Sequence, residues 1–248
     1  MLRQYRSVIL MSAAAWGCGE QPEDLIMKAR YTLPFLVLLW LGIVVGVLGA
    51  ADWDIRNERL APGLSFKDRT TITAEKNFND YTPLNPDGTV NAIIEIPAGT
   101  LAKWEVDPKT GILAWEIQDG KPRVVQYLGY PGNYGTIPRT VSGDGDPLDI
   151  LVIGDAVLRG SVVQVKVIGA LRLQDKGEAD DKLIAVLPGT HFSSVRSLAE
   201  LNQKFPGVTS IIETWFTNYK GAGKMKSQGF VEADGAKQLL AVSIAAYK

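Results

Sequence analysis

The chain has 248 residues, enough for one large domain or two small ones, with 46% hydrophobic and 21% charged residues, which is typical of a globular protein. The formal net charge of -1 gives no overall attraction to nucleic acid or to an anionic membrane, so affinity for a polyanion requires a local site. One cysteine and one histidine exclude an internal disulfide framework, a Cys-rich zinc site and a His-based metal cluster.

The N-terminal part differs in character from the rest. Residues 31–51 are apolar and carry no charge, and Lys28 and Arg30 precede them. Read from Met27, this is a basic start, an apolar stretch and a small-residue end, which predicts a signal peptide over 27–51. The stretch is also long enough for an uncleaved membrane anchor. Both interpretations predict an exported, periplasmic or membrane-anchored protein that meets the membrane only through this segment.

Residues 1–26 precede that segment and have a basic start of their own at Arg3 and Arg6. They are interpreted either as a leader or as an upstream artefact of a translation start at Met27. Residues 52–89 are polar, with prolines and asparagines that break any period. We expect an extended lead-in that packs late or stays mobile, followed by the folded domain over 90–248.

Alternating and β-branched runs dominate the next part of the chain. A Pro-Lys-Thr-Gly turn at 108–111 predicts a hairpin, in which Lys103 and Glu105 point to the same side. Short turns between successive strands favour a barrel or closed sheet. The expected strands cover 90–97, 103–107, 112–116, 123–127, 150–153, 160–173 and 182–187.

The C-terminal part has a helical period. Ser193 or Ser194 is expected to cap a first helix that runs to Lys204, and Pro206 to begin a second that ends at Gly221. A third helix is expected over 235–247. The sequence therefore predicts a mainly β fold with α-helices, a barrel flanked by C-terminal helices.

The stretch Asp-Gly-Asp-Pro-Leu-Asp at 144–149 leads directly into an apolar strand. Carboxylates this close raise one another's pKa unless a cation lies among them, and Mg²⁺ prefers oxygen ligands. An EF-hand loop also begins with this pattern, but it would need an oxygen ligand at its fifth position and glycine at its sixth, where the chain has Leu148 and Asp149. We therefore expect a magnesium site that is not an EF-hand.

Other polar residues are expected at strand ends and turns, and they mix carboxylates, cations and phenols. Carboxylates can hold metal ions while lysine, arginine and tyrosine hold phosphate oxygens, so the mixture suits a metal–phosphate complex. The residues are Glu95, Lys103, Glu105, Arg123, Tyr134, Asp144, Asp146, Asp149, Asp175, Asp180, Lys182, Tyr219 and Lys220.

Several short motifs resemble those of soluble, family I inorganic pyrophosphatases, in the same order and spacing over residues 90–225. They are Glu95-Ile-Pro, Lys103-Trp-Glu105, Tyr130-Pro-Gly-Asn-Tyr134-Gly, the stretch at 144–149 and Tyr219-Lys220. The resemblance implies an OB-like closed β-barrel, several Mg²⁺ per active site with Mn²⁺ as the alternative, and hydrolysis of pyrophosphate to two phosphates. It also suggests that the chain assembles as a homo-oligomer, namely a hexamer. The usual location in the family is the cytoplasm.

The same resemblance implies residue roles. Asp146 would be the general base on a water activated between metals. The metal ligands would be Asp144, Asp149 and Asp180 at the tighter sites, with Asp149 bridging, Asp175 for metals that arrive with the substrate, and Glu95 and Glu105 at outer positions. The phosphates would be held by Lys103, Arg123, Tyr134, Lys182, Tyr219 and Lys220. The chain departs from the family pattern in a shorter spacing between Arg123 and Tyr130 and in Thr136, where some members have an aromatic residue.

Three alternatives remain beside this interpretation. A nucleic-acid or oligosaccharide module would use a basic groove with exposed aromatic residues, which the acidic turns at 144–149 and 175–181 disfavour, so no nucleic-acid partner is expected. A second alternative is a protein that binds metal or phosphate without turnover. A third is a phosphohydrolase with a broader substrate range, acting on polyphosphate or nucleotides.

Overall fold

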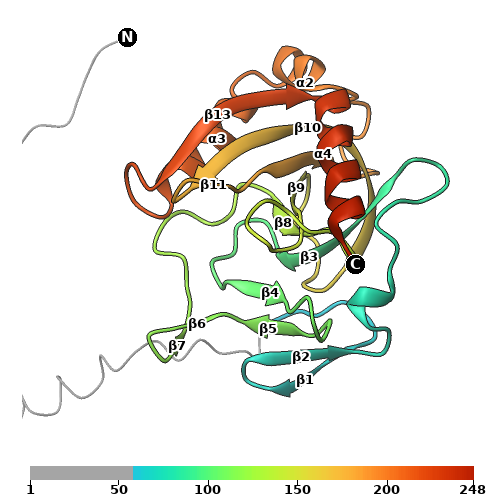
Figure 1. Ribbon diagram of the computed structural model, residues 1–248, viewed down its shortest axis with the longest axis vertical. Coiled ribbons are helices and arrows are strands. Elements are labelled where there is room, and N and C mark those ends of the chain that lie inside the picture. Colours follow the sequence, from blue (N-terminus) through green and yellow to red (C-terminus); the bar gives the residue numbers. More distant parts are fainter. Residues whose placement is uncertain (1–57) are drawn as a thin grey trace, which may run out of the picture. The chain divides into compact units, whose positions relative to one another are not determined.

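The computed structural model describes residues 58–248 (Figure 1). The expected leader over 1–26, the signal peptide or anchor over 27–51 and the first part of the lead-in lie outside these residues. The elements are β1 (Leu64–Asp68), β2 (Thr71–Ala74), the 3-10 helix η2 (Phe78–Asp80), β3 (Val90–Ile96), β4 (Trp104–Val106), β5 (Leu113–Trp115), β6 (Ile117–Gln118), β7 (Lys121–Pro122), β8 (Asn133–Thr136), β9 (Asp149–Ile153), β10 (Val162–Asp175), β11 (Glu178–Ala179), β12 (Lys182–Val186), α2 (Leu198–Lys204), α3 (Val208–Asn218), β13 (Met225–Glu232) and α4 (Ala233–Ala246).

Five strands close into a ring. β10 pairs antiparallel with β12, β12 runs parallel to β9, and β8 and β3 follow antiparallel. The first part of β10 pairs with β3 and closes the ring, while its second part pairs with β13. An irregularity between Val167 and Gly169 interrupts the register of β10, and such bulges let a strand bend around a barrel. The predicted mainly β fold with a closed barrel is confirmed.

The ring strands β3, β9 and β12 are rich in Ile, Leu, Val and Ala because nearly all of their residues are buried. All seven residues of β3 and all five of β12 are buried. Strands covered on both faces read as continuous apolar runs instead of alternating ones. The barrel therefore supplies a rigid frame, and polar residues at the ends of these strands mark where the frame meets solvent.

A second sheet, in the order β1-β2-β5-β4, lies beside the barrel. The expected hairpin over 103–116 is present as β4 and β5, with Trp104 opposite Trp115 and their rings stacked at a centroid distance of 5.2 Å. The structure differs from the expected lead-in, because β1, β2 and η2 form within it and Ile72 and Phe78 are buried in this sheet's core. Short strands of this kind depend on a partner far along the chain, here β5.

Three further details differ from the expectations. Residues 123–127 form only an isolated bridge, between Ala102 and Val124, while residues 133–136, which are not among the expected strands, form β8. The cap of α2 is Ser197, whose side chain accepts a hydrogen bond from the Glu200 backbone N–H. β13 was not expected, because its mixed polar sequence is stabilised by pairing along β10.

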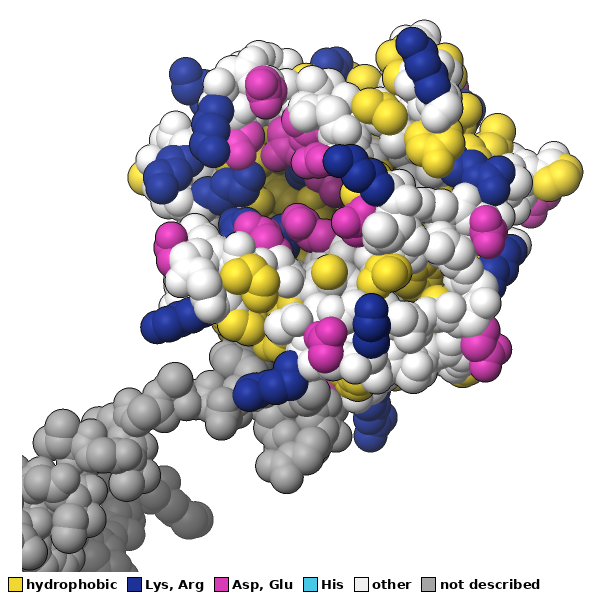
Figure 2. All heavy atoms as spheres, turned by 60° about the horizontal axis from the view of Figure 1, so that its bottom comes forward, with side chains coloured by type: hydrophobic (Ala, Val, Ile, Leu, Met, Phe, Trp, Pro, Cys, Tyr) yellow, Lys and Arg dark blue, Asp and Glu magenta, His cyan; other side chains and the backbone are white. Residues whose placement is uncertain are grey.

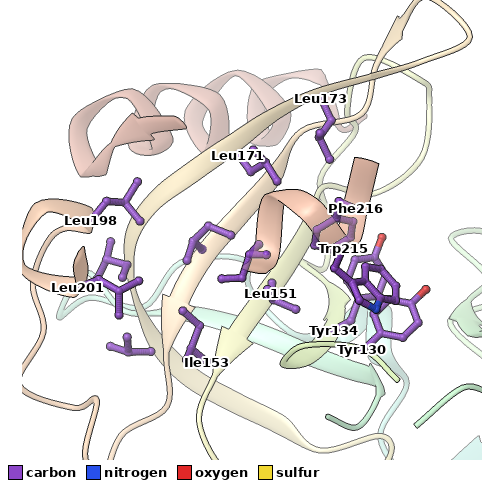
Figure 3. Packing of buried hydrophobic residues seen from close by; sticks show 14 of the residues in the cluster. Tyr130, Tyr134, Leu151, Ile153, Leu171, Leu173, Leu198, Leu201, Trp215 and Phe216 are labelled. Atoms are coloured by element: carbon purple, nitrogen blue, oxygen red, sulfur yellow. The ribbon is translucent and has the colours of Figure 1, made fainter. Parts of the chain in front are cut away.

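C-terminal helices flank the barrel, as predicted, and α4 packs along β10 and β13 (Figure 1). An apolar cluster separate from the core of the second sheet joins α2 and α3 to the barrel strands (Figure 3). Leu198 and Leu201 lie at one end of this cluster, and Tyr130, Tyr134 and Trp215 lie together at the other. No helix within residues 58–248 has the length and apolar character needed to cross a membrane.

Gly135 allows β8 to pack closely against β3, and this leads to a test of the barrel. A Cβ at Gly135 would lie 1.8 Å from the backbone oxygen of Ile93, which cannot move without breaking the ladder. We expect Gly135→Ala to lower the free energy of unfolding by about 3 kcal/mol, measured by urea denaturation.

Gly88→Ala is the matched control. Nothing lies within 4 Å of a Cβ there, but φ is +78°, so the substitution should cost only about 1 kcal/mol of backbone strain. Equal losses for the two variants would contradict close packing at Gly135.

Candidate active site

A cavity of about 520 Å³ opens where the ends of the barrel strands meet the second sheet. Figure 2 shows a hollow on this face, with acidic and basic side chains gathered around it. All thirteen residues singled out from the sequence line the cavity, although they come from segments spread over 126 positions, from Glu95 to Lys220. The cavity thus brings together ten carboxylates and five cations, when all its charged lining residues are included.

The barrel itself positions two of these residues. In the parallel ladder of β9 and β12, Asp149 and Lys182 are direct partners at the first position of each strand. The ammonium of Lys182 contacts the carboxylates of both Asp149 and Asp180. Lys182 is only 2% exposed, so its charge needs these partners, and it holds the two carboxylates next to each other.

The loop before β9 carries Asp144 and Asp146. A tight turn forms as the Ser142 N–H donates to the Asp146 backbone oxygen at 2.7 Å, with Gly145 at φ +89°. Asp144 accepts a hydrogen bond from the Asp146 backbone N–H at 3.1 Å. Within the described residues the Asp146 carboxylate itself makes no hydrogen bond or ion pair, so it is free to accept a proton from a bound molecule.

The opposite wall comes from the β10–β11 hairpin and the end of α3. Asp175 is the last residue of β10, and Lys220 donates to its carboxylate at 2.7 Å. Tyr219 is the C-cap of α3 and stacks on Trp215 at a centroid distance of 4.5 Å. The apolar cluster of Figure 3 therefore fixes the phenol and the neighbouring lysine at the cavity edge.

Further lining residues come from β3, from β4 with the residue before it, and from the segment after β7. Lys103 and Glu105 form an ion pair on the same side of the chain, as the two-residue period predicts. Glu95 is buried and accepts a hydrogen bond from the Val106 backbone N–H at 2.7 Å, which ties β3 to β4. Arg123 donates from one nitrogen to both oxygens of Glu116, at 2.9 and 2.7 Å.

Burial and mutual repulsion shift the pKa values of the carboxyl groups. Burial, together with Asp180 and Asp149, raises the pKa of Asp144 to about 6. Burial also raises the pKa of Asp146, and the charges of Glu105 and Asp149 add to the effect. The neighbouring lysines, in contrast, lower the pKa of Glu105 and of Asp180. The cavity has more carboxylates than cations, which is the condition under which added cations bind.

Two other groups are held in one protonation state. Burial raises the pKa of Tyr134 well above its ordinary value, and Asp149 adds to this, so the phenol keeps its proton. Burial alone would lower the pKa of Lys182, but Asp149 and Asp180 keep it above its ordinary value. Tyr134 and Lys182 are therefore hydrogen-bond donors at any physiological pH.

The donor set fits hard divalent cations, because it consists of carboxylates, and the chain's one imidazole is not among the residues that line the cavity. Within residues 58–248, however, no three acidic, histidine or cysteine side chains stand together in a geometry that would hold one ion. The ammonium of Lys182 lies between Asp149 and Asp180, where a cation would bind. A metal ion held by these carboxylates has to displace Lys182.

Four charged lining residues were missed in the sequence: Asp107, Glu116, Lys176 and Glu178. Glu116 could have been found, because the expected hairpin puts it opposite Lys103, and its backbone N–H does bond the Lys103 carbonyl at 2.9 Å. Lys176 and Glu178 belong to an acidic turn that was expected, but their orientation depends on the β10–β11 register.

The comparisons with known proteins agree with this geometry. A family model described as inorganic pyrophosphatase matches residues 92–248. The inorganic pyrophosphatase of Agrobacterium fabrum is 35% identical over 170 residues, covering 66% of this chain and 93% of the relative. The mitochondrial inorganic pyrophosphatase of Saccharomyces cerevisiae is 37% identical over 161 residues, covering 55% of this chain and 52% of the relative.

A crystal structure of inorganic pyrophosphatase from Thermus thermophilus superimposes with a TM-score of 0.60 at 30% identity, covering 69% of this chain and 99% of that one. The chain spans about half the length of three eukaryotic relatives that it matches, the yeast protein among them.

The position of Lys182 leads to a prediction about metal binding. We expect Lys182→Met to raise the affinity for Mg²⁺ in the absence of any phosphate by about tenfold, or about 1.4 kcal/mol, because the competing ammonium is gone. Isothermal titration calorimetry of the full chain measures this.

Lys237→Met is the control, since Lys237 pairs with Asp234 on the exposed face of α4, outside the cavity. If Lys182→Met does not fold, Lys220→Met removes the ammonium from Asp175 and should show the same direction. Unchanged or weaker Mg²⁺ binding by a folded variant would contradict competition.

Proposed function

Because the chain belongs to the inorganic pyrophosphatase family, we propose that it hydrolyses inorganic pyrophosphate to two phosphates with the help of bound divalent cations. The observation that supports this proposal is the cavity, whose lining includes all thirteen residues to which the family resemblance assigns a role. A pyrophosphate ion carries several negative charges, and a site with both carboxylates and cations suits its complex with metal ions.

Asp146 is proposed as the general base. Its carboxylate is unpaired within the described residues, and burial and neighbouring charges raise its pKa towards neutral pH. A base with a pKa closer to the working pH is more effective at taking a proton from water in the transition state. Asp146 would take the proton of the water that attacks phosphorus.

The carboxylates around Lys182 are proposed as the metal ligands: Asp144, Asp149 and Asp180 at the tighter positions, with Asp175, Glu95 and Glu105 further out. Divalent cations held there, Mg²⁺ in the first instance and Mn²⁺ as the alternative, would lower the pKa of the attacking water towards about 7. Burial raises the pKa of Glu95 well above its ordinary value, while Lys103 acts in the opposite direction, and a divalent cation close by would favour the charged carboxylate further.

The cations and phenols are proposed to hold the two phosphates. Lys103, Lys182 and Lys220 are part of the cavity wall, and each loses its carboxylate partner when that carboxylate turns to a metal ion. Tyr134 keeps its proton and donates a hydrogen bond, and the remaining contacts come from Arg123 and Tyr219. Donors that point at the leaving phosphate stabilise the charge it acquires as the P–O bond breaks.

The first test is phosphate release from Mg²⁺-pyrophosphate by the full chain and by Asp146→Asn. We expect the substitution to lower kcat by about 10²–10⁴-fold, as for loss of a general base, while the affinity for Mg²⁺ changes little. Asp234→Asn, on the exposed face of α4, is the control. A near-normal rate in Asp146→Asn would show that another group takes the proton, and no release by the unaltered chain would overturn the proposed activity.

Two proposals rest on the sequence alone. We propose that residues 27–51 direct the protein out of the cytosol as a signal peptide or an anchor, and that the folded domain over 90–248 assembles as a homo-oligomer, a hexamer by family resemblance. N-terminal sequencing of the mature protein and sedimentation equilibrium measure these properties. A mature chain that starts at Met1 and stays in the cytosol, or a monomer, would contradict them.

A further inference from the structure

Four of the five cations that line the cavity are occupied by carboxylates. Lys103 pairs with Glu105, Arg123 with Glu116, Lys182 with both Asp149 and Asp180, and Lys220 with Asp175. Lys176 is the fifth, and within residues 58–248 it has no ion pair and no hydrogen bond, although Glu178 lies in the same turn. The cavity therefore has one cation that no carboxylate neutralises.

The backbone presents Lys176 at a defined place. The pairs Gln174–Ala179 and Asp175–Glu178 close the β10–β11 hairpin, so Lys176 and Gly177 form its two-residue turn, with φ +52° and +94°. A left-handed conformation in both positions is favourable for glycine or asparagine and costs energy for lysine. A lysine that keeps this conformation is held there by the register of the two strands.

The order of the cations along the wall gives Lys176 its position relative to the substrate. Of three lysines that line the cavity, Lys182 is almost fully buried, Lys220 is half-buried and holds Asp175, and Lys176, the next residue after Asp175, is exposed. A linear phosphate chain held at its inner end by the buried cations and extending past Asp175 would reach solvent beside Lys176.

We propose that Lys176 binds the third phosphate of a linear inorganic triphosphate, and so makes this chain accept tripolyphosphate beside pyrophosphate. The proposal rests on the proposed function, because the inner two phosphates use the same groups as pyrophosphate. Two phosphates occupy the four paired cations and the two phenols, and the free cation at the mouth matches one more phosphate.

The reaction is the same hydrolysis, with pyrophosphate instead of phosphate as the leaving group. Water adds to the phosphorus at the inner end, the bridging P–O bond breaks, and its electron pair stays on the departing oxygen. One water and one triphosphate give one phosphate and one pyrophosphate, with the water's proton taken up by Asp146. No oxidant or further reactant is needed.

The test is the ratio of kcat/KM for tripolyphosphate to kcat/KM for pyrophosphate, with Mg²⁺ as the metal and the full chain as the enzyme. We expect Lys176→Gln to lower this ratio about five- to tenfold, because one charge-assisted contact to phosphate is lost. Lys176→Arg should restore most of it. Glu178→Gln removes the opposite charge from the same turn and should raise the ratio, while Lys67→Gln, exposed on β1 outside the cavity, should leave it unchanged.

An equal loss of kcat/KM for both substrates in Lys176→Gln would overturn the proposal, since it would show general attraction of anions instead of a contact with the third phosphate. An unchanged ratio would overturn it too.

Binding of Mg²⁺-tripolyphosphate and Mg²⁺-pyrophosphate to the Asp146→Asn background, measured by calorimetry, separates this proposal from the proposed function. If the unaltered chain hydrolyses neither substrate but Lys176→Gln still weakens only triphosphate binding, the hydrolytic function fails and the third-phosphate site stands.

Discussion

The contact of the Lys182 ammonium with Asp149 and Asp180 is the interaction on which the rest of the site depends. Carboxylates at the end of a fully buried strand pair would repel each other and disfavour the barrel, and a buried cation from the neighbouring strand removes this repulsion. The parallel register of β9 and β12 puts that cation in place through backbone hydrogen bonds, independently of any ligand. In the proposed function, the same carboxylates would bind metal ions and release a lysine that would turn to phosphate.

The architecture explains how residues far apart in the chain reach one cavity. The barrel ends present Asp149 and Lys182, the β10–β11 hairpin presents Asp175, and the second sheet presents Lys103. Because the ring of strands is closed, none of these walls can move far without disturbing its neighbours. The site is therefore built mainly on sheet ends and tight turns, and α3 contributes its last turn through aromatic packing.

The sequence reveals the chemistry of the site better than its contacts. Residue type and order were enough to select thirteen of the residues that line the cavity. Apolar and β-branched runs were enough for most barrel strands, and alternation for the Lys103–Glu105 pair. Elements that are stabilised by distant partners were not predicted from the sequence, because β2 requires β5 and β13 requires β10. Lys176 was missed for the same reason, because its orientation follows from strand register instead of local pattern, whereas Glu116 could have been found from the expected hairpin. The roles of the lining residues remain predictions.

The long strand β10 has a consequence for how the molecule acquires its shape. It pairs with β3, which precedes it, and with β12 and β13, which follow it, so two of the five pairings that close the ring and the pairing with β13 all involve this one strand. Contacts between segments so distant along the chain are slow to form, because the intervening loops must first be ordered. During synthesis, the ring cannot close before β12 has emerged, and the tyrosine and lysine after α3 arrive later still. Folding intermediates should therefore lack an assembled pocket, and catalytic competence should appear in the last cooperative step.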